Sequence, residues 1–442
     1  MPNIISVSLR SRFKLITFLI VISLPCLLLA AESARIAWAA HLGKSSQIAE
    51  MKRAVSLDPV NPDLHFRLGT AEVYDLENPG LPQGIQQLLL ASQLSPRETR
   101  YWEALASACE FEGDQKCAGR AIEKSLALSP MAPRIHWEAA NYYLWANQQE
   151  QAFGEFRRLL ELDPGYAAAA FRSALGAAGD PKVVYRALLK TDSRPQLKLA
   201  YVNFLASQGR EDVALQFWKE LVAGKPRLSF SAADVYLEHL IAGRNYDKAL
   251  SVWNDMESLG LIRQSDQSYG LVFNGGFEYP PMNAGFDWRY QQAPYVAINF
   301  QGHEPFEGKH CLQLSFSDVE NHQEEPVYEI VPVNPEQTYV LTAEVRSNNI
   351  VSGSGPQIRV IDPECRECLN ASSGEIVGTT PWHEVRLTFR TGPHTTAVRI
   401  SVWRARSLGY PTEILGTLWL DQVTLKPTAT AFSAAAGERR SF

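Results

Sequence analysis

The six cysteines are the residues whose spacing points most directly to chemistry. Cys365 and Cys368 form a C-x-x-C motif within the polar stretch DPECRECLN. A zinc site would need two more soft ligands at matching spacing, and the sequence offers none. A thioredoxin-like redox motif would need a strand-to-helix setting, which this stretch lacks. We therefore predict a small loop closed by a disulfide.

A second cysteine pair flanks a predicted turn between two helices. Cys109 and Cys117 lie on either side of the turn FEGDQK. Antiparallel helices bring the two ends of such a turn together, so we predict a disulfide here, with two buried thiols as the alternative. Cys26 falls within an apolar run and is expected to be a thiol buried in a membrane. Cys311 is left unpaired on a predicted buried strand.

The sequence contains no recognisable catalytic arrangement. It has no H-E-x-x-H, no G-x-S-x-G, no glycine-rich phosphate loop and no G-x-G-x-x-G after a strand. The nine histidines are scattered, and His303 and His322, which have acidic neighbours, lie in stretches that we interpret as solvated turns. We therefore predict that the protein is not an enzyme and requires no cofactor.

Composition places the chain among globular proteins of two or three domains. It has 442 residues, of which 45% are hydrophobic and 20% are charged. Its formal charge is −6, and basic residues cluster only within the first fourteen positions. A mildly acidic chain has no electrostatic reason to bind nucleic acid, so we expect no nucleic-acid partner.

The N-terminus carries an export signal or an anchor. A basic segment, 1–14, precedes an uncharged apolar run, 15–31, whose 17 residues are near the lower limit for spanning a bilayer. Basic residues before the run and Glu32 after it predict a cytoplasmic N-terminus and an exported remainder. A cleaved signal peptide would need a small-x-small site, which Ala31-Glu32-Ser33 matches poorly. We favour an uncleaved anchor whose helix continues through ESARIAWAAHL. This predicts a single-pass inner-membrane protein with most of the chain in the periplasm or extracytoplasmic space.

A proline-terminated pattern recurs through the first half of the chain. Pro59, Pro96, Pro130 and Pro164 each follow a small or acidic residue, with gaps of 37, 34 and 34 residues. A 34-residue period that ends in proline resembles the tetratricopeptide repeat, in which proline closes the second helix of each pair. We predict tetratricopeptide-like repeats over 32–262, with five to seven helical hairpins. Such a solenoid has a long concave surface that either binds a protein partner or acts as a spacer.

After residue 270 the helical periodicity gives way to short strands. Alternating runs such as HEVRLTFRT and AVRISVWRA, separated by turn residues, predict an antiparallel sandwich of two sheets over 271–427. The tail 428–442 is predicted to be disordered. The fold class is therefore a membrane helix, then an α-helical solenoid, then a C-terminal β-sandwich.

The second half of the chain carries an ordered set of short motifs. NGGFE at 274–278 is followed by GFDW, EGKHCLQL, QTYVLTAEVRS and GTLWLDQVTL. Together they resemble the carbohydrate-binding-module-like, galactose-binding-like β-sandwich. The resemblance implies a jelly-roll fold and, as an expectation, binding of a polysaccharide, although many such domains are purely structural.

The same resemblance implies two kinds of site. Glu278 and Asp421 match positions that hold a structural calcium ion, with carbonyl groups of the loop 308–310 as further ligands. The alternative is that Glu278 caps a turn and Asp421 accepts bonds from backbone amides. Sugar binding uses exposed aromatic rings, and the candidates are Trp288, Tyr290, Tyr295, Trp403 and Tyr410. For Trp288 the alternative is a core position, which is the more common one for the tryptophan of GFDW. We expect Trp382 and Trp419 to point into the core.

The sequence thus predicts a non-catalytic, membrane-anchored extracytoplasmic scaffold. Its repeats would bind a protein and its sandwich a polysaccharide, in exopolysaccharide or envelope assembly. Two alternatives remain open. One is a pure protein-interaction scaffold with a structural sandwich. The other is a secreted accessory module that targets a glycan for a degrading enzyme, which requires a mature N-terminus beyond Ser33.

Overall fold

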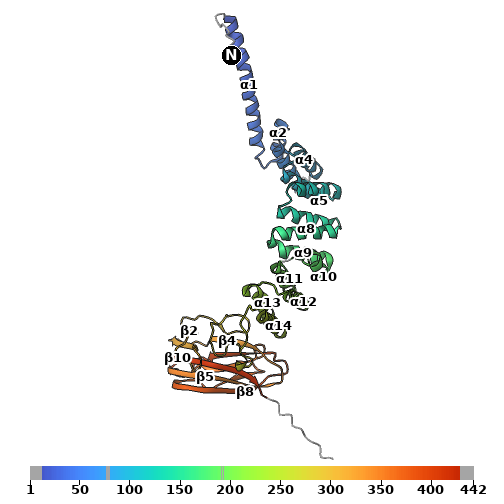
Figure 1. Cartoon of the computed structure of the whole chain (residues 1–442). Coiled ribbons are helices and arrows are strands. Elements are labelled where there is room, and N and C mark those ends of the chain that lie inside the picture. The colour runs from blue at the N-terminus through green and yellow to red at the C-terminus, as the bar shows by residue number, and fades with distance from the viewer. Residues whose placement is uncertain (1–11, 76–79, 191, 193, 429–442) are drawn as a thin grey trace, which may run out of the picture. The chain divides into compact units, whose positions relative to one another are not determined.

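The computed structural model describes residues 12–75, 80–190, 192 and 194–428 (Figure 1). The chain forms two compact units, Met1–Ser193 and Arg194–Phe442. The first is helical in the residues described, and the second joins four helices to a β-sandwich. These elements confirm the predicted fold class. Residues 1–11 of the predicted basic segment and 429–442 of the predicted tail lie outside the described residues.

Helix α1 (Arg12–Leu42) begins the first unit and continues through ESARIAWAAHL without a break. The helical segment Leu15–Leu42 is long and apolar enough to cross a membrane, judged by its length and composition alone. The apolar run 15–31 is exposed, whereas Ala39 near the end of the helix is fully buried against Ala54 and Leu64. The last turns of α1 are therefore part of the packed helical unit.

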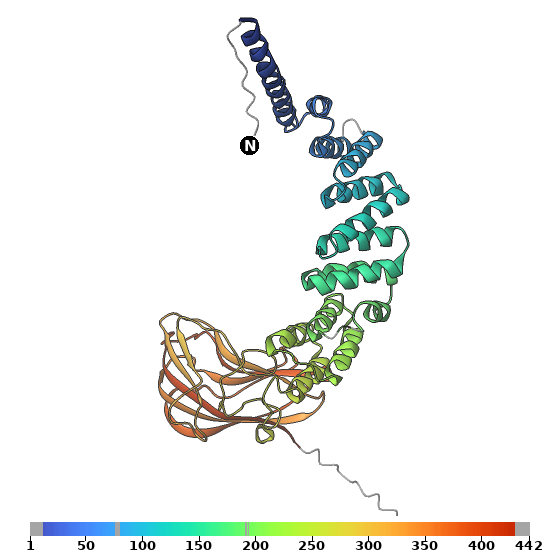
Figure 2. The ribbon, with the colours of Figure 1, turned by 45° about the horizontal axis from the view of Figure 1, so that its top comes forward.

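The remaining helices of the first unit follow as antiparallel neighbours (Figure 2). They are α2 (Ile48–Leu57), α3 (Pro62–Val73), α4 (Leu81–Leu94), α5 (Thr99–Glu112), α6 (Gln115–Leu128), α7 (Pro133–Trp145), α8 (Gln149–Leu162), α9 (Ala167–Ala178) and α10 (Pro181–Leu188), with a 3-10 turn η1 (Pro164–Tyr166) before α9. Helices α3 to α10 pair consecutively, and each pair contacts the next. This is the solenoid arrangement that the 34-residue period predicts.

Small residues set the spacing of the helices within a pair. A Cβ atom on Gly69 would lie 2.8 Å from the carbonyl oxygen of Gly84, and a Cβ on Gly84 would lie 2.7 Å from the Val73 side chain. Helices α3 and α4 therefore approach each other backbone to backbone, which only glycine allows. In the next pair, Ala106 and Ala118 are buried at the equivalent contact.

The recurring prolines also make a tertiary contact. In three repeats, the ring of a residue six positions after the proline bonds to the proline carbonyl oxygen: His65 to Pro59 at 2.8 Å, Trp102 to Pro96 at 3.1 Å and His136 to Pro130 at 3.0 Å. The loop that joins two repeats is therefore fastened to the first helix of the second repeat. The sequence period thus has a physical counterpart in the loop between repeats.

The second unit begins with α11 (Pro195–Ser207), α12 (Glu211–Ala223), α13 (Phe230–Ala242) and α14 (Tyr246–Ser258). The last pair packs directly on the start of the sandwich. Trp253 of α14 contacts Phe273 and Phe286 at ring distances of 5.1 and 5.8 Å. Glu238 of α13 forms an ion pair with Arg289 at 2.6 Å and accepts the Gly285 amide. The change from helices to strands therefore falls within one compact unit.

The sandwich consists of two five-stranded antiparallel sheets. Its strands are β1 (Arg289–Tyr290), β2 (Val296–Asn299), β3 (Leu312–Asp318), β4 (Glu324–Pro332), β5 (Thr338–Val351), β6 (Gln357–Ile361), β7 (Asn370–Ser372), β8 (Gly378–Arg390), β9 (Ala397–Arg404) and β10 (Ile414–Pro427). The first sheet has the order β1-β4-β9-β6-β7, and the second has the order β2-β3-β10-β5-β8. Side chains alternate along each strand, so Val398, Ile400 and Val402 of β9 face the core between the sheets.

Candidate functional site

The five predicted sugar-binding aromatic residues do not share one surface. Trp288 is fully buried in the core, 5.0 Å from Phe277, so its proposed sugar contact is wrong. Tyr290 pairs in register with the core residue Val327 and packs against Phe300, so it also faces inward. Both rings stabilise the sandwich and cannot stack on a polysaccharide.

The other three candidates are more accessible. Tyr295 is half-buried and stacks on His322, with ring centroids 4.6 Å apart, so one face of its ring is covered. Tyr410 is 88% exposed in the loop between β9 and β10. Trp403 of β9 alternates with the core residues and therefore lies on the outer face of the first sheet. Of the five, Trp403 is the ring with the richest set of neighbouring polar side chains.

Two arginines cover aromatic rings on this outer face. The guanidinium of Arg359 lies 4.2 Å from the centre of the Trp403 ring, and that of Arg399 lies 4.5 Å from the centre of the Tyr328 ring. Strand register places Ser401 directly between Tyr328 and Arg359. We call Tyr328, Arg359, Arg399, Ser401 and Trp403 the arginine–aromatic face. It joins strands β4, β9 and β6, which come from three separate stretches of the sequence.

The arginines of this face differ in their partners. Arg399 forms an ion pair with Glu325 at 3.3 Å. Arg359 instead donates from Nε to the neutral side-chain amide of Asn370 at 2.9 Å. Burial, and then the nearby charge of Arg366, lowers the pKa of the Arg359 guanidinium. Glu325, the partner of Arg399, also acts on Arg359 and opposes this effect, so the two arginines share one carboxylate.

Several polar atoms of this face have no hydrogen-bond partner among the residues that the structure describes. They are Ser401 Oγ, Trp403 Nε1 and Arg399 Nε, all shielded from solvent. Ser401 as a whole is only 1% exposed. A buried polar group without a partner costs about 1–3 kcal/mol, and native structures keep few of them. Orphaned donors and acceptors beside aromatic rings are what a ligand with hydroxyl or acidic groups would satisfy.

The two predicted calcium ligands converge on one loop. Glu278 Oε1 accepts the amides of Lys309 at 2.8 Å and His310 at 3.2 Å. Asp421 Oδ2 accepts the amides of Phe306 at 2.9 Å and Glu307 at 3.2 Å. These contacts are the amide-bonding alternative that the sequence left open. Burial raises the pKa of Asp421 to about 6, and the charge of Glu278 adds to this effect.

Whether these residues fit calcium depends on the remaining ligands. The described residues contain no group of three or more His, Cys, Asp or Glu side chains that could hold a metal ion. The loop turns N–H groups toward the two carboxylates, and these N–H groups already meet part of the demand for positive charge. A calcium ion would need carbonyl or water oxygens in their place. Calcium at this position therefore stays a prediction.

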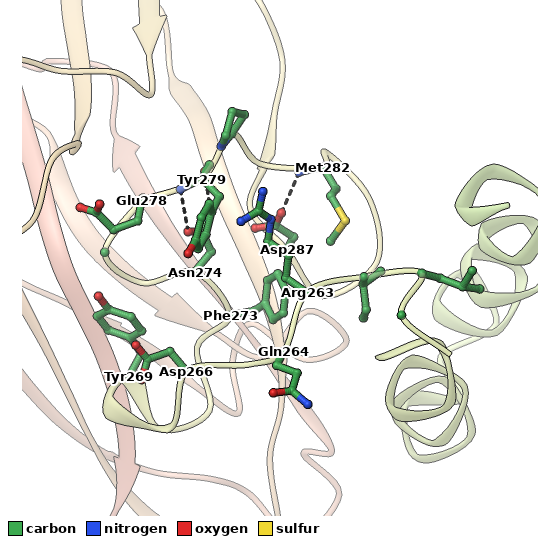
Figure 3. A pocket seen from close by; sticks show the side chains of 15 residues that line it. Arg263, Gln264, Asp266, Tyr269, Phe273, Asn274, Glu278, Tyr279, Met282 and Asp287 are labelled. Carbon is green, nitrogen blue, oxygen red and sulfur yellow. Dashed lines mark hydrogen bonds between the residues drawn. The ribbon is translucent and has the colours of Figure 1, made fainter. Parts of the chain in front are cut away.

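A pocket of about 360 Å³ lies where the last helix meets the sandwich (Figure 3). It is lined by 260–264, by the 3-10 turn η2 (Gln267–Tyr269) and by the first loop of the sandwich. Arg263 stacks on Tyr279 at 3.7 Å, and Asp287 Oδ2 accepts the Met282 amide at 2.7 Å. These two contacts hold the loop around the pocket and occupy part of the bonding capacity of its lining.

The first unit offers a groove along its helices. A hollow of about 360 Å³ is lined by residues of α3, α4, α5 and α7, including Phe66, Tyr74 and Glu138. Tyr74 is 62% exposed, and burial raises the pKa of Glu138. Arg134 forms ion pairs with both Glu103 and Glu138. The groove thus combines an exposed ring with partly buried carboxylates.

Both predicted cysteine pairs are bonded in the structure. Cys109 and Cys117 have Cα atoms 5.7 Å apart across the α5–α6 turn, and Cys365 and Cys368 have Cα atoms 5.2 Å apart in the loop after β6. The second disulfide holds the loop that carries Arg366. It therefore fixes one border of the arginine–aromatic face.

The expectation that Trp382 and Trp419 are core residues is wrong. Both are partly exposed, and Arg346 lies 4.8 Å above the Trp419 ring on the outer face of the second sheet. A signal in the sequence was available for Trp419. In LWLDQV it stands between Leu418 and Leu420, and alternation requires that it face away from them.

No family model matches the chain, and no curated protein matches it. Among solved structures, it is similar to a tetratricopeptide repeat protein from Parabacteroides merdae, with 14% identity over 52% of this chain and 94% of that one (TM-score 0.31). It is similar to the MamA protein, with 15% identity over 43% and 92% (TM-score 0.31). It is also similar to a family 16 carbohydrate-binding module, with 16% identity over 36% and 99% (TM-score 0.26). These likenesses concern the fold alone, so function must be argued from the residues.

Proposed function

We propose that the protein is a non-catalytic, membrane-anchored extracytoplasmic scaffold. Its sandwich binds a polysaccharide through the arginine–aromatic face, and its repeats bind a protein partner. This combination suits a role in exopolysaccharide or envelope assembly. The observation that carries the proposal is the arginine–aromatic face itself, where two rings flank a buried serine hydroxyl that has no partner.

The composition of this face supports sugar binding. Ligand sites combine apolar and aromatic surface with a small number of placed polar groups. Trp403 and Tyr328 supply the rings, while Ser401, Arg359 and Arg399 supply hydrogen-bonding groups within the same patch. A sugar chain offers both ring C–H surface and hydroxyl groups, so it can meet both needs at once.

The packing of α1 supports an anchor. The apolar run 15–31 is exposed along its whole length, and such a surface needs an apolar environment. Beyond the run, Arg35 donates a hydrogen bond to the carbonyl oxygen of Leu57, and Ala39 is buried. The anchor helix therefore enters the packed helical unit with no flexible linker between them. That arrangement suits a protein that holds its repeats at a membrane surface.

The groove in the first unit supports a protein partner. Its exposed Tyr74 would suit an apolar side chain, and Arg134 with its two ion-pair partners, Glu103 and Glu138, would suit a segment with charges of both signs. Peptides commonly bind in grooves that present a few apolar anchors. The partner would thus be recognised through both apolar contact and charge.

One observation favours a second candidate function. Helix α14 packs against β4, and α13 and α14 hold the first loop of the sandwich through Glu238 and Trp253. A sandwich fixed in this way can also serve purely as a structural cap on the repeats. The protein would then act only through its groove.

Binding of the full-length chain to soluble polysaccharides, measured by calorimetry in detergent micelles, tests the proposal. Trp403→Ala should weaken binding by about tenfold or more, as expected for a central aromatic contact. Trp419→Ala is the matched control, because Trp419 also lies outward beneath an arginine, on the opposite sheet. Unchanged affinity in Trp403→Ala would exclude this face. No binding to any polysaccharide, with a protein still captured by the repeats, would favour the structural-cap function.

A further inference from the structure

The two arginines of the arginine–aromatic face share a single acidic side chain, Glu325, which pairs with Arg399 and also acts on Arg359. We infer that the polysaccharide it takes is anionic, a chain whose sugars bear carboxylate groups, as in a polyuronate. The inference rests on the proposed function and specifies its ligand class. It depends on how Arg359 and Arg399 are held, and on which surfaces of Trp403 and Tyr328 they cover.

Arg359 is the side chain best placed to take a carboxylate. It is 8% exposed, and its Nε donates to Asn370, which is neutral. Within the described residues, its two terminal nitrogens donate to no side chain and form no ion pair. A planar guanidinium recognises a carboxylate with two parallel hydrogen bonds. Arg366, on the disulfide-closed loop nearby, adds a second positive charge that acts on Arg359.

The aromatic rings are covered in a way that disfavours a neutral sugar. A neutral pyranose binds by laying its C–H face on a ring. Here Arg359 occupies a face of Trp403 at 4.2 Å, and Arg399 occupies a face of Tyr328 at 4.5 Å. A neutral sugar that stacked on one of these two covered faces would have to displace a guanidinium and lose that contact. An acidic sugar would instead pair with the guanidinium where it stands.

Ser401 completes the arrangement. It lies in register between Tyr328 and Arg359, and its hydroxyl has no partner although the residue is 1% exposed. The indole Nε1 of Trp403 is a second buried donor without a partner. Both atoms are shielded from solvent, so a carboxylate or hydroxyl oxygen reaches them only when a covering side chain moves aside; such a contact would then offset the cost of leaving them without a partner. Oxygen-rich acidic sugars carry both kinds of group.

The second sheet provides an internal comparison. Arg346 also lies over a tryptophan, Trp419, at 4.8 Å. Arg346, however, forms an ion pair with Glu304 at 2.5 Å, so its charge is already neutralised. The same arginine-over-tryptophan pair therefore occurs with and without a carboxylate partner. In the described part of the chain, the arginine of the first-sheet pair forms no direct ion pair, although the charge of Glu325 acts on it.

Calorimetry on the full-length chain in detergent tests the inference. The ligands are polygalacturonate, alginate and hyaluronan, a fully methyl-esterified polygalacturonate with the same backbone but no charge, and a neutral arabinoxylan. Dextran sulfate controls for attraction to any polyanion. We expect binding to at least one polyuronate, about tenfold or more weaker binding to the uncharged polymers, and weak binding of dextran sulfate.

Matched variants assign the effect to this face. Arg359→Gln should weaken polyuronate binding by about tenfold to a hundredfold, because it removes a charge-assisted contact. Arg346→Gln should leave it unchanged. Equal affinity for the esterified and acidic polymers would overturn the inference while the proposed function stands. Equal affinity for dextran sulfate, or equal loss in Arg346→Gln, would also overturn it. Binding to none of the polymers would remove the proposed glycan function as well.

Discussion

Three carboxyl groups of the sandwich lie in surroundings that disfavour their charge. Burial raises the pKa of Glu324 to about 7 and of Asp287 to about 6, and it raises the pKa of the fully enclosed Glu329 well above its ordinary value. At Glu324, the charge of Arg404 opposes the rise in pKa, and the neighbouring Asp318 adds to it. Folding therefore favours the protonated form of each of these carboxyl groups.

This environment predicts an unusual pH dependence of stability. Between about pH 4.5, where the unfolded chain ionises, and about pH 7, where Glu324 ionises in the folded state, the folded state keeps an extra proton. The free energy of unfolding of the sandwich should therefore fall as the pH rises through this window. Glu324→Gln should make the fall shallower when melting is followed calorimetrically at pH 5 and pH 7.5. Glu320→Gln, at an exposed neighbouring position, is the control, and equal slopes in both variants would contradict the assignment.

Glu278 and Asp421 predict an effect of calcium on the same domain. Their carboxylates accept hydrogen bonds from the backbone of one loop, and the charge of Glu278 helps to raise the pKa of Asp421. If calcium binds between them, adding it in millimolar excess should raise the melting temperature of the sandwich, because a ligand that binds only the folded state stabilises it. Magnesium should do less, and Glu278→Gln should abolish the gain. An unchanged melting temperature with calcium and with a chelator would show that the loop amides alone satisfy the pair.

Residue roles were predictable only where strand alternation fixed them. The alternation of Val398, Ile400 and Val402 already places Trp403 on an outer face. Trp288 precedes β1 in a loop, where no period applies, so only its place in the GFDW motif indicated that it could be a core residue. The stacking of Arg359 on Trp403 could not be predicted either, because β6 and β9 become neighbours only through the sheet order.

At the scale of elements, the solenoid was the more predictable half because its contacts are local. A proline-ended 34-residue period determines which helices pair and where the loops lie. For the sandwich, the strands could be predicted from the sequence but their order in the sheets could not, because pairing and register depend on strands that are distant in sequence. The packing of α14 on the first loop of the sandwich left no periodic signal at all.

The close contact of α3 and α4 predicts a position-specific cost for added side-chain volume. Gly69→Ala should lower the free energy of unfolding of the first unit by about 1–3 kcal/mol, because its Cβ would lie 2.8 Å from a backbone oxygen that cannot move aside. Gly154→Ala in α8 is the matched control, since a Cβ there has no neighbour within 4 Å. That change should stabilise by roughly 0.5–1 kcal/mol through helix propensity. Urea unfolding followed by circular dichroism measures both, and equal effects would show that the helices can separate.

At the scale of the whole molecule, one continuous helix combines a membrane-length apolar run with a packed end. The run 15–31 is exposed with respect to the residues that the structure describes, whereas Ala39 and the Arg35–Leu57 hydrogen bond join the following turns to α2 and α3. The two halves of α1 therefore have separable roles. The first half concerns the membrane, and the second half concerns the stability of the repeats.

Two truncations separate these roles. A chain that starts at residue 32 should leave the membrane fraction and become soluble, yet its first unit should melt at the same temperature as in the full chain. A chain that starts at residue 44 loses the burial of Ala39 against Ala54 and Leu64 and should melt several degrees lower. Fractionation with carbonate and with detergent, followed by calorimetry, measures both effects. A full chain that carbonate alone extracts from membranes would contradict the anchor. A mature N-terminus found by mass spectrometry beyond Ser33 would contradict it as well, since the packed turns of α1 would then be all that remains of the helix.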